Sequence, residues 1–181
     1  NASSITFPNN GKKLTATMKV NAVKLPLKIK QKTTVLKVSG LANGDSVASW
    51  KSGNTKVVKV SGKPNGTCTL AAGRKKGKTT ITIILKSGLK KKITITVQKA
   101  AVKTSKITGM PKNLKLKKNQ TVTLKATAAP LTSLQKLKYK SSNKKIVTVT
   151  SKGVIKAKKK GKAVITVQSG SKTVKCKVTV K

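Results

Sequence analysis

The feature that most constrains the fold of this chain is an internal repeat. Residues 50–60 recur 89 positions later as residues 139–149, with Trp50 matched by Tyr139 and Asn54 matched by Asn143. Self-similarity at a fixed offset indicates one structural unit that occurs twice. The sequence therefore predicts two small domains built in the same way, with Trp50 and Tyr139 at equivalent core positions.

Apolar and polar residues alternate through most of the chain, which is typical of half-buried β-strands. Ile93, Ile95 and Val97, for example, fall on one face of an extended chain, and the residues between them are threonines. Turn residues separate such runs about every 8–12 positions, as in sandwich folds, and no stretch has a helical period. Pro26 has no backbone N–H to donate, so its strand is expected at the edge of a sheet or at a bulge.

These patterns predict an all-β fold of two tandem β-sandwich domains, at residues 1–99 and 100–181. We interpret residues 1–13 as an N-terminal extension of the first domain, anchored by Ile5 and Phe7. Leu, Ile, Val and Phe make up about 25% of the chain, above the roughly 20% below which disorder is expected. The chain is therefore expected to fold despite its high charge.

The charge balance is extreme, with 43 lysine and arginine residues against one acidic residue, Asp45. Same-face neighbours along a strand are about 6.6–6.8 Å apart. This is less than the roughly 8 Å Debye length at physiological salt, so like charges there repel one another. The net charge of +42 must therefore cost stability. Two interpretations stay open: lysine is simply the usual polar-face residue of this chain, or the surface binds a polyanion.

A lysine-rich segment precedes a β-branched strand in both copies. Residues 72–83 read AGRKKGKTTITI, and residues 156–167 read KAKKKGKAVITV. We interpret each as a hairpin turn, because glycine accepts the positive φ that tight turns need. We predict that the cations of these turns bind a polyanion bivalently, from two repeated sites. The predicted binding residues are Arg74, Lys75, Lys76, Lys78, Lys158, Lys159, Lys160 and Lys162.

The residue inventory argues against catalysis. The chain has no histidine and one carboxylate, so it lacks the group titrating near neutrality and the pair of acids that acid–base catalysis and glycoside hydrolysis use. One acid cannot form a hard-cation site, and we expect no metal, no cofactor and no catalytic residue. Cys68 and Cys176 fall in different copies and are expected to be free, buried thiols.

No apolar run approaches the roughly 20 residues that a membrane helix needs, so we expect no membrane span. The chain begins with Asn1 and shows no signal peptide. We expect it to be a monomeric fragment of a larger protein, with an upstream signal or further domains outside it.

Several segments together resemble the group 2 bacterial immunoglobulin-like domains, which also occur in invasin- and intimin-type surface proteins. They include residues 118–124 (KNQTVTL), 139–143 (YKSSN), 161–167 (GKAVITV) and 178–180 (VTV). The resemblance covers nearly all of the second copy and the Trp-containing and C-terminal parts of the first. It implies two tandem immunoglobulin-like β-sandwiches in a secreted or surface-attached bacterial protein. The family serves as spacers, stalks and adhesive modules, so the resemblance names a fold rather than a ligand.

The favoured function is a non-catalytic spacer or stalk whose charge holds it on the cell wall or another polyanion, with teichoic acid-like wall polymers or acidic glycans as partners. One alternative is an adhesin module that binds host anionic glycans. Another is a non-specific nucleic-acid-binding protein, since such binding is expected in vitro. Sequence-specific reading is not expected, because only one of the cations is an arginine and aromatic platforms are missing. Lysines spread evenly would favour wall retention, whereas a single patch or groove would favour recognition.

Overall fold

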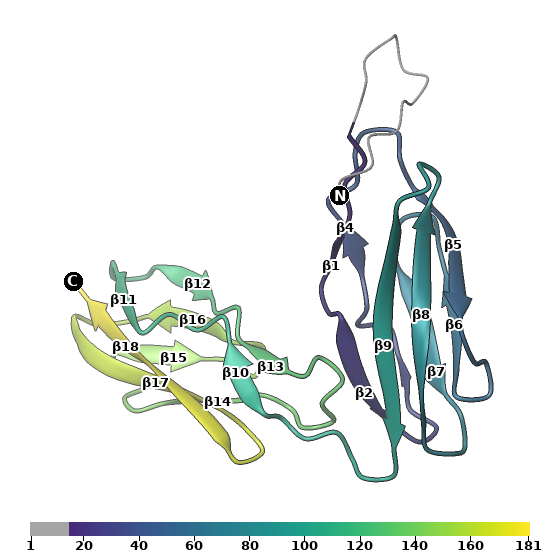
Figure 1. Cartoon of the computed structure of the whole chain (residues 1–181). Coiled ribbons are helices and arrows are strands. Elements are labelled where there is room, and N and C mark those ends of the chain that lie inside the picture. The colour runs from purple at the N-terminus through teal and green to yellow at the C-terminus, as the bar shows by residue number, and fades with distance from the viewer. Residues whose placement is uncertain (1–14) are drawn as a thin grey trace. The chain divides into compact units, whose positions relative to one another are not determined.

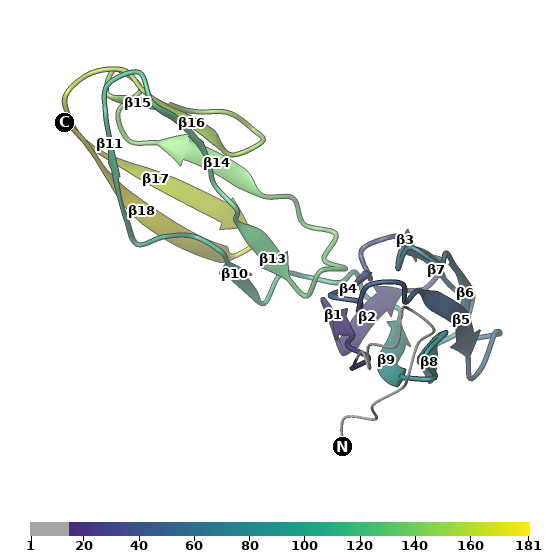
Figure 2. The ribbon, with the colours of Figure 1, turned by 90° about the horizontal axis from the view of Figure 1, so that it is seen from above.

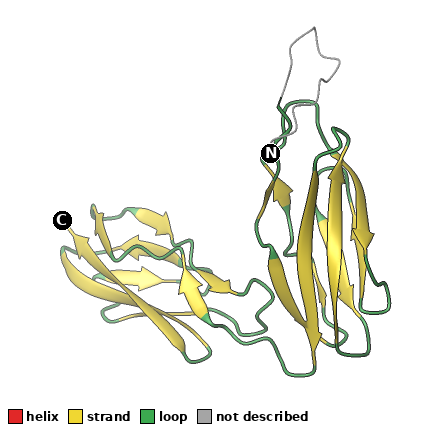
Figure 3. Cartoon of the chain, viewed as in Figure 1, coloured by secondary structure: helices red, strands yellow, loops and turns green. Residues whose placement is uncertain are grey.

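The computed structural model of the chain describes residues 15–181, and the expected N-terminal extension with Ile5 and Phe7 lies outside them. The chain divides into two compact units: unit 1 ends at Ala101, and unit 2 comprises Val102–Lys181. Both units consist of strands and loops, and none of the described residues is helical (Figure 3). The described part of the chain accordingly offers no helix that could cross a membrane. The predicted all-β fold is confirmed.

The described part of unit 1, from residue 15 onward, contains nine strands, most of which alternate apolar residues with lysine or threonine. They are β1 (Lys19–Val20), β2 (Lys24–Lys28), β3 (Lys32–Thr33), β4 (Val38–Ser39), β5 (Val47–Ser52), β6 (Val58–Gly62), β7 (Cys68–Ala72), β8 (Gly77–Leu85) and β9 (Lys90–Gln98). A four-stranded sheet, β2-β9-β8-β5, faces a three-stranded sheet, β3-β7-β6, and β1 pairs with β4 (Figures 1 and 2). Unit 1 is therefore a β-sandwich of two layers.

Unit 2 repeats this arrangement strand for strand. Its strands are β10 (Lys106–Thr108), β11 (Asn113–Leu116), β12 (Thr121–Thr123), β13 (Thr127–Ala129), β14 (Lys138–Ser141), β15 (Val147–Val149), β16 (Val154–Ala157), β17 (Gly161–Ser169) and β18 (Lys172–Val180). The sheets are β11-β18-β17-β14 and β12-β16-β15, and β10 pairs with β13. The two tandem immunoglobulin-like sandwiches that the repeat predicts are thus present with one topology.

One of the two edge strands of each four-stranded sheet runs parallel to the last strand of the same unit (Figure 1). β2 pairs with β9 in this way, and β11 pairs with β18. Because β2 has only one neighbour, Pro26 sits on an edge strand as predicted, where its missing N–H removes no bond from the middle of the sheet. The long pairs β8–β9 and β17–β18 are antiparallel and form the centre of each sheet.

The core of each unit lies between its two layers. Ile93, Ile95 and Val97 are buried on the inward face of β9, as the alternation predicts. Burial of a side chain of this size contributes about 1.5–3 kcal/mol. The core cluster of unit 2 consists of Leu116, Leu124, Val147, Ile155, Ala157, Ala163, Ile165, Cys176, Val178 and Val180. Apolar burial of this kind offsets the repulsion among the surface lysines.

Trp50 and Tyr139 occupy equivalent register positions, as predicted, paired with the buried residues Ile83 and Val167. Both rings are half-buried rather than fully enclosed, and Tyr139 packs against the core cluster of unit 2. Each lies on the outermost strand of a four-stranded sheet, where no further strand covers the outer side of the ring. Each ring instead packs on a glycine of the opposite layer. A methyl group at Gly62 would overlap the Trp50 ring, and one at Gly153 would lie 2.9 Å from Tyr139.

The lysine-rich segments are crossovers between the two layers, and the hairpin prediction is wrong for both. β7 belongs to the three-stranded sheet and β8 to the four-stranded one, and β16 and β17 are divided in the same way. The strands before and after each crossover belong to different sheets, and each turns its apolar face toward the core between the two layers. The chain therefore passes from one layer to the other between them. Gly77 has no positive φ; a side chain there would meet Val57 at 2.9 Å, so close approach explains this glycine.

Cys68 on β7 and Cys176 on β18 are free and buried, as predicted. Burial raises the pKa of the Cys68 thiol to about 11 and raises the pKa of the Cys176 thiol as well. Both therefore stay protonated at neutral pH and behave as small core residues.

Candidate functional site: a cationic groove on unit 1

Lysine side chains cover both units. Each lysine within the described residues 15–181 is exposed except Lys91, which is half-buried and donates a hydrogen bond from Nζ to the Met18 carbonyl oxygen at 2.8 Å. The exposed lysines lie on strands and turns of both layers in both units. The charge is therefore spread over both units as a coat and is not gathered in a single patch.

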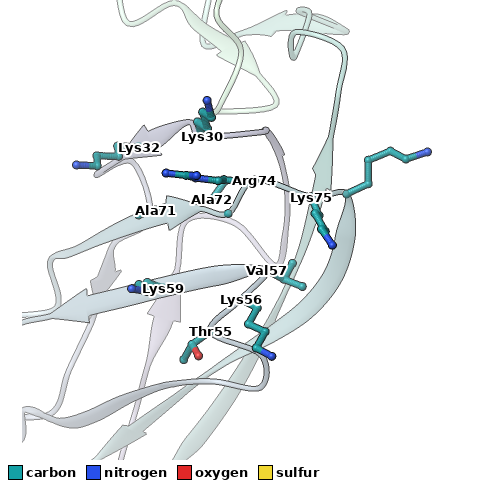
Figure 4. Close-up of a pocket in the computed structure, with 12 residues that line it drawn as sticks. Lys30, Lys32, Thr55, Lys56, Val57, Lys59, Ala71, Ala72, Arg74 and Lys75 are labelled. Atoms are coloured by element: carbon teal, nitrogen blue, oxygen red, sulfur yellow. The ribbon is translucent and has the colours of Figure 1, made fainter.

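A pocket of about 830 Å³ lies on the surface of unit 1. Its floor is formed by Val57, Ala71 and Ala72 (Figure 4), and Gly73 also lines it. Seven basic residues also line it, namely Lys30, Lys32, Lys56, Lys59, Arg74, Lys75 and Lys76. We call this pocket the cationic groove.

The register of the three-stranded sheet produces the middle of the groove. Ala71 on β7 is the direct partner of Lys32 on β3 and of Lys59 on β6. The two lysines are exposed, whereas Leu70 next to Ala71 is buried, so this row lies on the outer face of the sheet. Neighbouring strands are about 4.8 Å apart, which puts the two lysine Cα atoms about 9.6 Å from each other across a methyl-sized floor.

Gly73 connects the three segments that carry the cations of the cationic groove. Its N–H donates to the Val57 carbonyl oxygen at 2.8 Å, and its own carbonyl oxygen accepts from the Lys30 N–H at 3.0 Å. A side chain at this position would overlap the Lys56 carbonyl oxygen. Only glycine therefore permits this approach, and the β2–β3 turn, the β5–β6 loop and the lysine-rich crossover are tied at one point.

The predicted binding residues divide between several places. Arg74, Lys75 and Lys76 line the cationic groove, whereas Lys78 lies on β8 outside its lining. In unit 2 the predicted crossover residues Lys158, Lys159 and Lys160 are exposed in the β16–β17 connection. Lys162 is the second residue of β17 and lines a separate pocket of about 340 Å³ together with Lys177.

Sequence reasoning missed four lining cations of the cationic groove, Lys30, Lys32, Lys56 and Lys59. They come from positions up to 46 residues away from Lys76, and nothing in the local sequence separates them from other lysines. The strand register around Ala71 brings in Lys32 and Lys59. The contacts of Gly73 bring in Lys30 and Lys56, and both signals require the fold to be known.

The cationic groove contains cations without a carboxylate partner in its lining. Asp45 lies elsewhere, and its Oδ1 accepts hydrogen bonds from the backbone N–H groups of Ser46 and Ser87 at 2.9 and 3.2 Å. Within residues 15–181, no three His, Cys, Asp or Glu side chains lie together in a way that could hold a metal ion. The chemistry that this site supports is the binding of an anion.

Residues 101–180 match the family model described as Bacterial Ig-like domain (group 2). Unit 2 is a bacterial Ig-like domain. Unit 1 has the same strand order as this Ig-like domain, and its parallel pair β2–β9 corresponds to the parallel pair β11–β18.

Known proteins similar to the chain include a kappa-carrageenase from Pseudoalteromonas carrageenovora, 46% identical over 66 residues. That match covers 36% of this chain and 17% of the carrageenase. The solved structure of domains 5–6 of the S-layer protein SbsC has 21% identity and a TM-score of 0.45, with 91% of this chain and 97% of that one covered. The longer S-layer structure rSbsC(31–844) has 21% identity and a TM-score of 0.41. That match covers 81% of this chain and 23% of the S-layer chain.

Proposed function

We propose that the chain is a non-catalytic, strongly cationic module of a secreted or cell-surface bacterial protein. Its Ig-like units act as a spacer or stalk, and its lysine coat holds the protein on a polyanionic wall polymer of the teichoic acid type. The observation that carries this proposal is the distribution of the lysines, which are exposed over both units. The Ig-like family that unit 2 matches also supports a surface location.

The energetics favour a polymer as the ligand. The described lysines face solvent and are close enough to repel one another at physiological salt. A linear polyanion relieves this repulsion at many points, and each contact releases condensed counterions. For binding of this kind, the logarithm of the association constant falls linearly with the logarithm of salt concentration, and no fixed orientation is needed. A coat of flexible lysine point charges fits that mode of binding.

The experiment is co-sedimentation of the purified chain with isolated bacterial cell walls at several salt concentrations. The walls are used intact and after chemical extraction of their anionic polymers. Intact walls should retain the chain at 0.15 M salt, and extracted walls should lose most of it. Equal retention on both preparations would show that anionic polymers are not what holds it.

A second candidate is an adhesin module that binds host anionic glycans, which the presence of the cationic groove favours. The two candidates differ in competition experiments on the intact walls. Soluble wall polymer should release the chain if retention is its role. Preferential release by a sulfated glycosaminoglycan at equal charge concentration would favour the adhesin.

A further inference from the structure

We propose that the cationic groove of unit 1 is a binding site for one strand of an anionic polysaccharide, with a sugar ring over Ala71 and acidic substituents reaching the lysines on both sides. The proposal rests on the proposed polyanion binding and assigns to it a place, a geometry and a ligand class. Figure 4 shows Lys32 and Arg74 on one side of Ala71 and Lys59 on the other.

Unit 2 shows that the Ig-like fold does not by itself produce this groove. Its equivalent row is Thr121, Lys156 and Thr148, paired across β12, β16 and β15. In unit 2 a lysine lies between two threonines, whereas in unit 1 an alanine lies between two lysines. The exposed Lys156 therefore occupies the position that Ala71 has in the floor of the cationic groove. The same backbone thus carries an open channel with charged sides in unit 1 and a raised lysine in unit 2.

The crossover differs between the units in a way that builds the groove further. The N–H groups of Ala72 and Ala157 donate to the equivalent carbonyls of Gln31 and Gln120, both at 2.9 Å. Four residues then lead to Gly77 in unit 1, but three lead to Gly161 in unit 2. Unit 1 thus has one additional residue here. Gly73 alone makes two hydrogen bonds that unit 2 divides between two residues: the Ala157 carbonyl oxygen accepts from the Asn119 N–H at 2.9 Å, and the Lys158 N–H donates to the Ile146 carbonyl oxygen at 2.7 Å. The additional residue extends the crossover, and Gly73 fixes Arg74 next to the row of Ala71.

The chemistry of the lining selects the ligand class. The floor residues Val57, Ala71 and Ala72 present aliphatic groups, which suit the C–H face of a sugar ring. No aromatic side chain lines the pocket, so it lacks the stacking surface on which proteins hold nucleic-acid bases. Trp50, the single tryptophan of the chain, packs on Gly62 and does not line the pocket.

Size and charge agree with an extended polymer. A volume of about 830 Å³ falls within the roughly 300–1,000 Å³ of pockets that bury small ligands, enough for a few sugar units. The lysines on the two sides are about 9.6 Å apart at Cα, and their flexible stems can follow substituents at different places on the ring. Because no carboxylate is part of the lining, the acidic groups must come from the ligand.

The test measures binding of the full chain to dextran sulfate, with neutral dextran and inorganic polyphosphate as comparison polymers. One variant removes three groove charges, Lys32→Gln, Lys59→Gln and Arg74→Gln. Its matched control removes three exposed strand lysines of unit 2, and consists of Lys115→Gln, Lys138→Gln and Lys175→Gln. Each lysine or arginine contact releases about 0.7 counterions, so loss of three contacts should reduce the slope of log affinity against log salt concentration by about 2. If affinity at 1 M salt is unchanged, affinity at 0.15 M salt should fall about 50-fold.

A second variant separates shape from charge. Ala71→Lys raises the net charge but fills the floor, and Lys156 at the equivalent position shows that the fold accepts lysine there. Its control, Thr123→Lys, adds the same charge to an exposed position of β12. The proposal expects Ala71→Lys to bind dextran sulfate at least about fivefold more weakly, and Thr123→Lys to bind as tightly as the unchanged chain or more tightly. Circular dichroism confirms folding of each variant.

The outcomes distinguish this proposal from the wider one. If both triple variants lose affinity equally and Ala71→Lys binds no more weakly than Thr123→Lys, the groove is not a site and the lysine coat alone binds. If the groove variants weaken polyphosphate as much as dextran sulfate, the site holds anions without a preference for sugar and the polysaccharide assignment is wrong. If the unchanged chain binds dextran sulfate no better than dextran, both proposals fail.

Discussion

Replacement of Gly62 by alanine tests how the half-buried aromatic ring holds the edge of unit 1. Gly62 has no positive φ, so its backbone accepts alanine without strain and the effect comes from packing alone. The added methyl group would overlap three atoms of the Trp50 ring next to its attachment point. The ring must then leave its place, and with it the hydrogen bond from Nε1 to the Lys63 carbonyl oxygen at 3.3 Å.

The expected loss of stability is about 2 kcal/mol. Removing a core tryptophan side chain costs about 3–5 kcal/mol, and a half-buried ring accounts for about half of that. The lost hydrogen bond adds about 1 kcal/mol. Alanine in place of glycine returns about 0.4–1 kcal/mol, because it restricts the unfolded chain.

Fluorescence follows this change directly, since Trp50 is the one tryptophan of the chain. The Gly62→Ala variant should show red-shifted native emission and a urea midpoint lower by about 1 M. The control is Gly53→Ala, which also lacks a positive φ and whose nearest neighbour would be Thr79 Oγ1 at 3.3 Å. If Gly62→Ala keeps the native emission and unfolds with the control, the ring does not pack on Gly62 and the reasoning is refuted.

Three further changes probe other parts of the structure. Ser141→Ala should destabilise unit 2 by about 1–3 kcal/mol, because the buried hydroxyl donates to a backbone carbonyl oxygen at 2.6 Å; Ser52→Ala, at the half-buried equivalent, should cost less in the same urea titration. Because burial raises the pKa of Cys68 and Cys176, a thiol reagent at pH 8 should react slowly with the native chain and rapidly with two groups after unfolding without reductant; fast native reaction would contradict their burial. Ile165→Ala should cost about 2–5 kcal/mol in calorimetry, and a cost below 1 kcal/mol would place this side chain outside the core.

Much of the fold could be predicted from the sequence, because the information is local or repeated. Alternation marks Ile93, Ile95 and Val97 as one buried face, and the missing N–H of Pro26 indicates an edge strand. The crossovers could not be predicted in this way. A glycine among lysines indicates that the chain turns at Gly77, but which sheet receives the next strand depends on layers that form from distant parts of the chain.

The candidate site was predictable only in part for a related reason. A run of cations is visible in any sequence, and Arg74, Lys75 and Lys76 belong to such a run. Ala71 attracts no notice as a residue, yet its register with Lys32 and Lys59 opens the cationic groove. The small side chain of Ala71 matters because exposed lysines lie on both neighbouring strands, Lys32 on β3 and Lys59 on β6. The half-buried state of Trp50 has the same origin, since it follows from the edge position of β5.

The parallel pairing of β2 with β9 and of β11 with β18 has a mechanical consequence for each unit. Tension applied through the chain pulls β2 and β9 along their length in opposite directions, so the hydrogen bonds between them share the load in shear instead of opening one after another. This clamp joins five residue pairs in unit 1, Lys24–Lys28 with Thr94–Gln98. It joins four in unit 2, Asn113–Leu116 with Lys177–Val180. Under steady force, the Ig-like domain of unit 2 is therefore expected to rupture before unit 1.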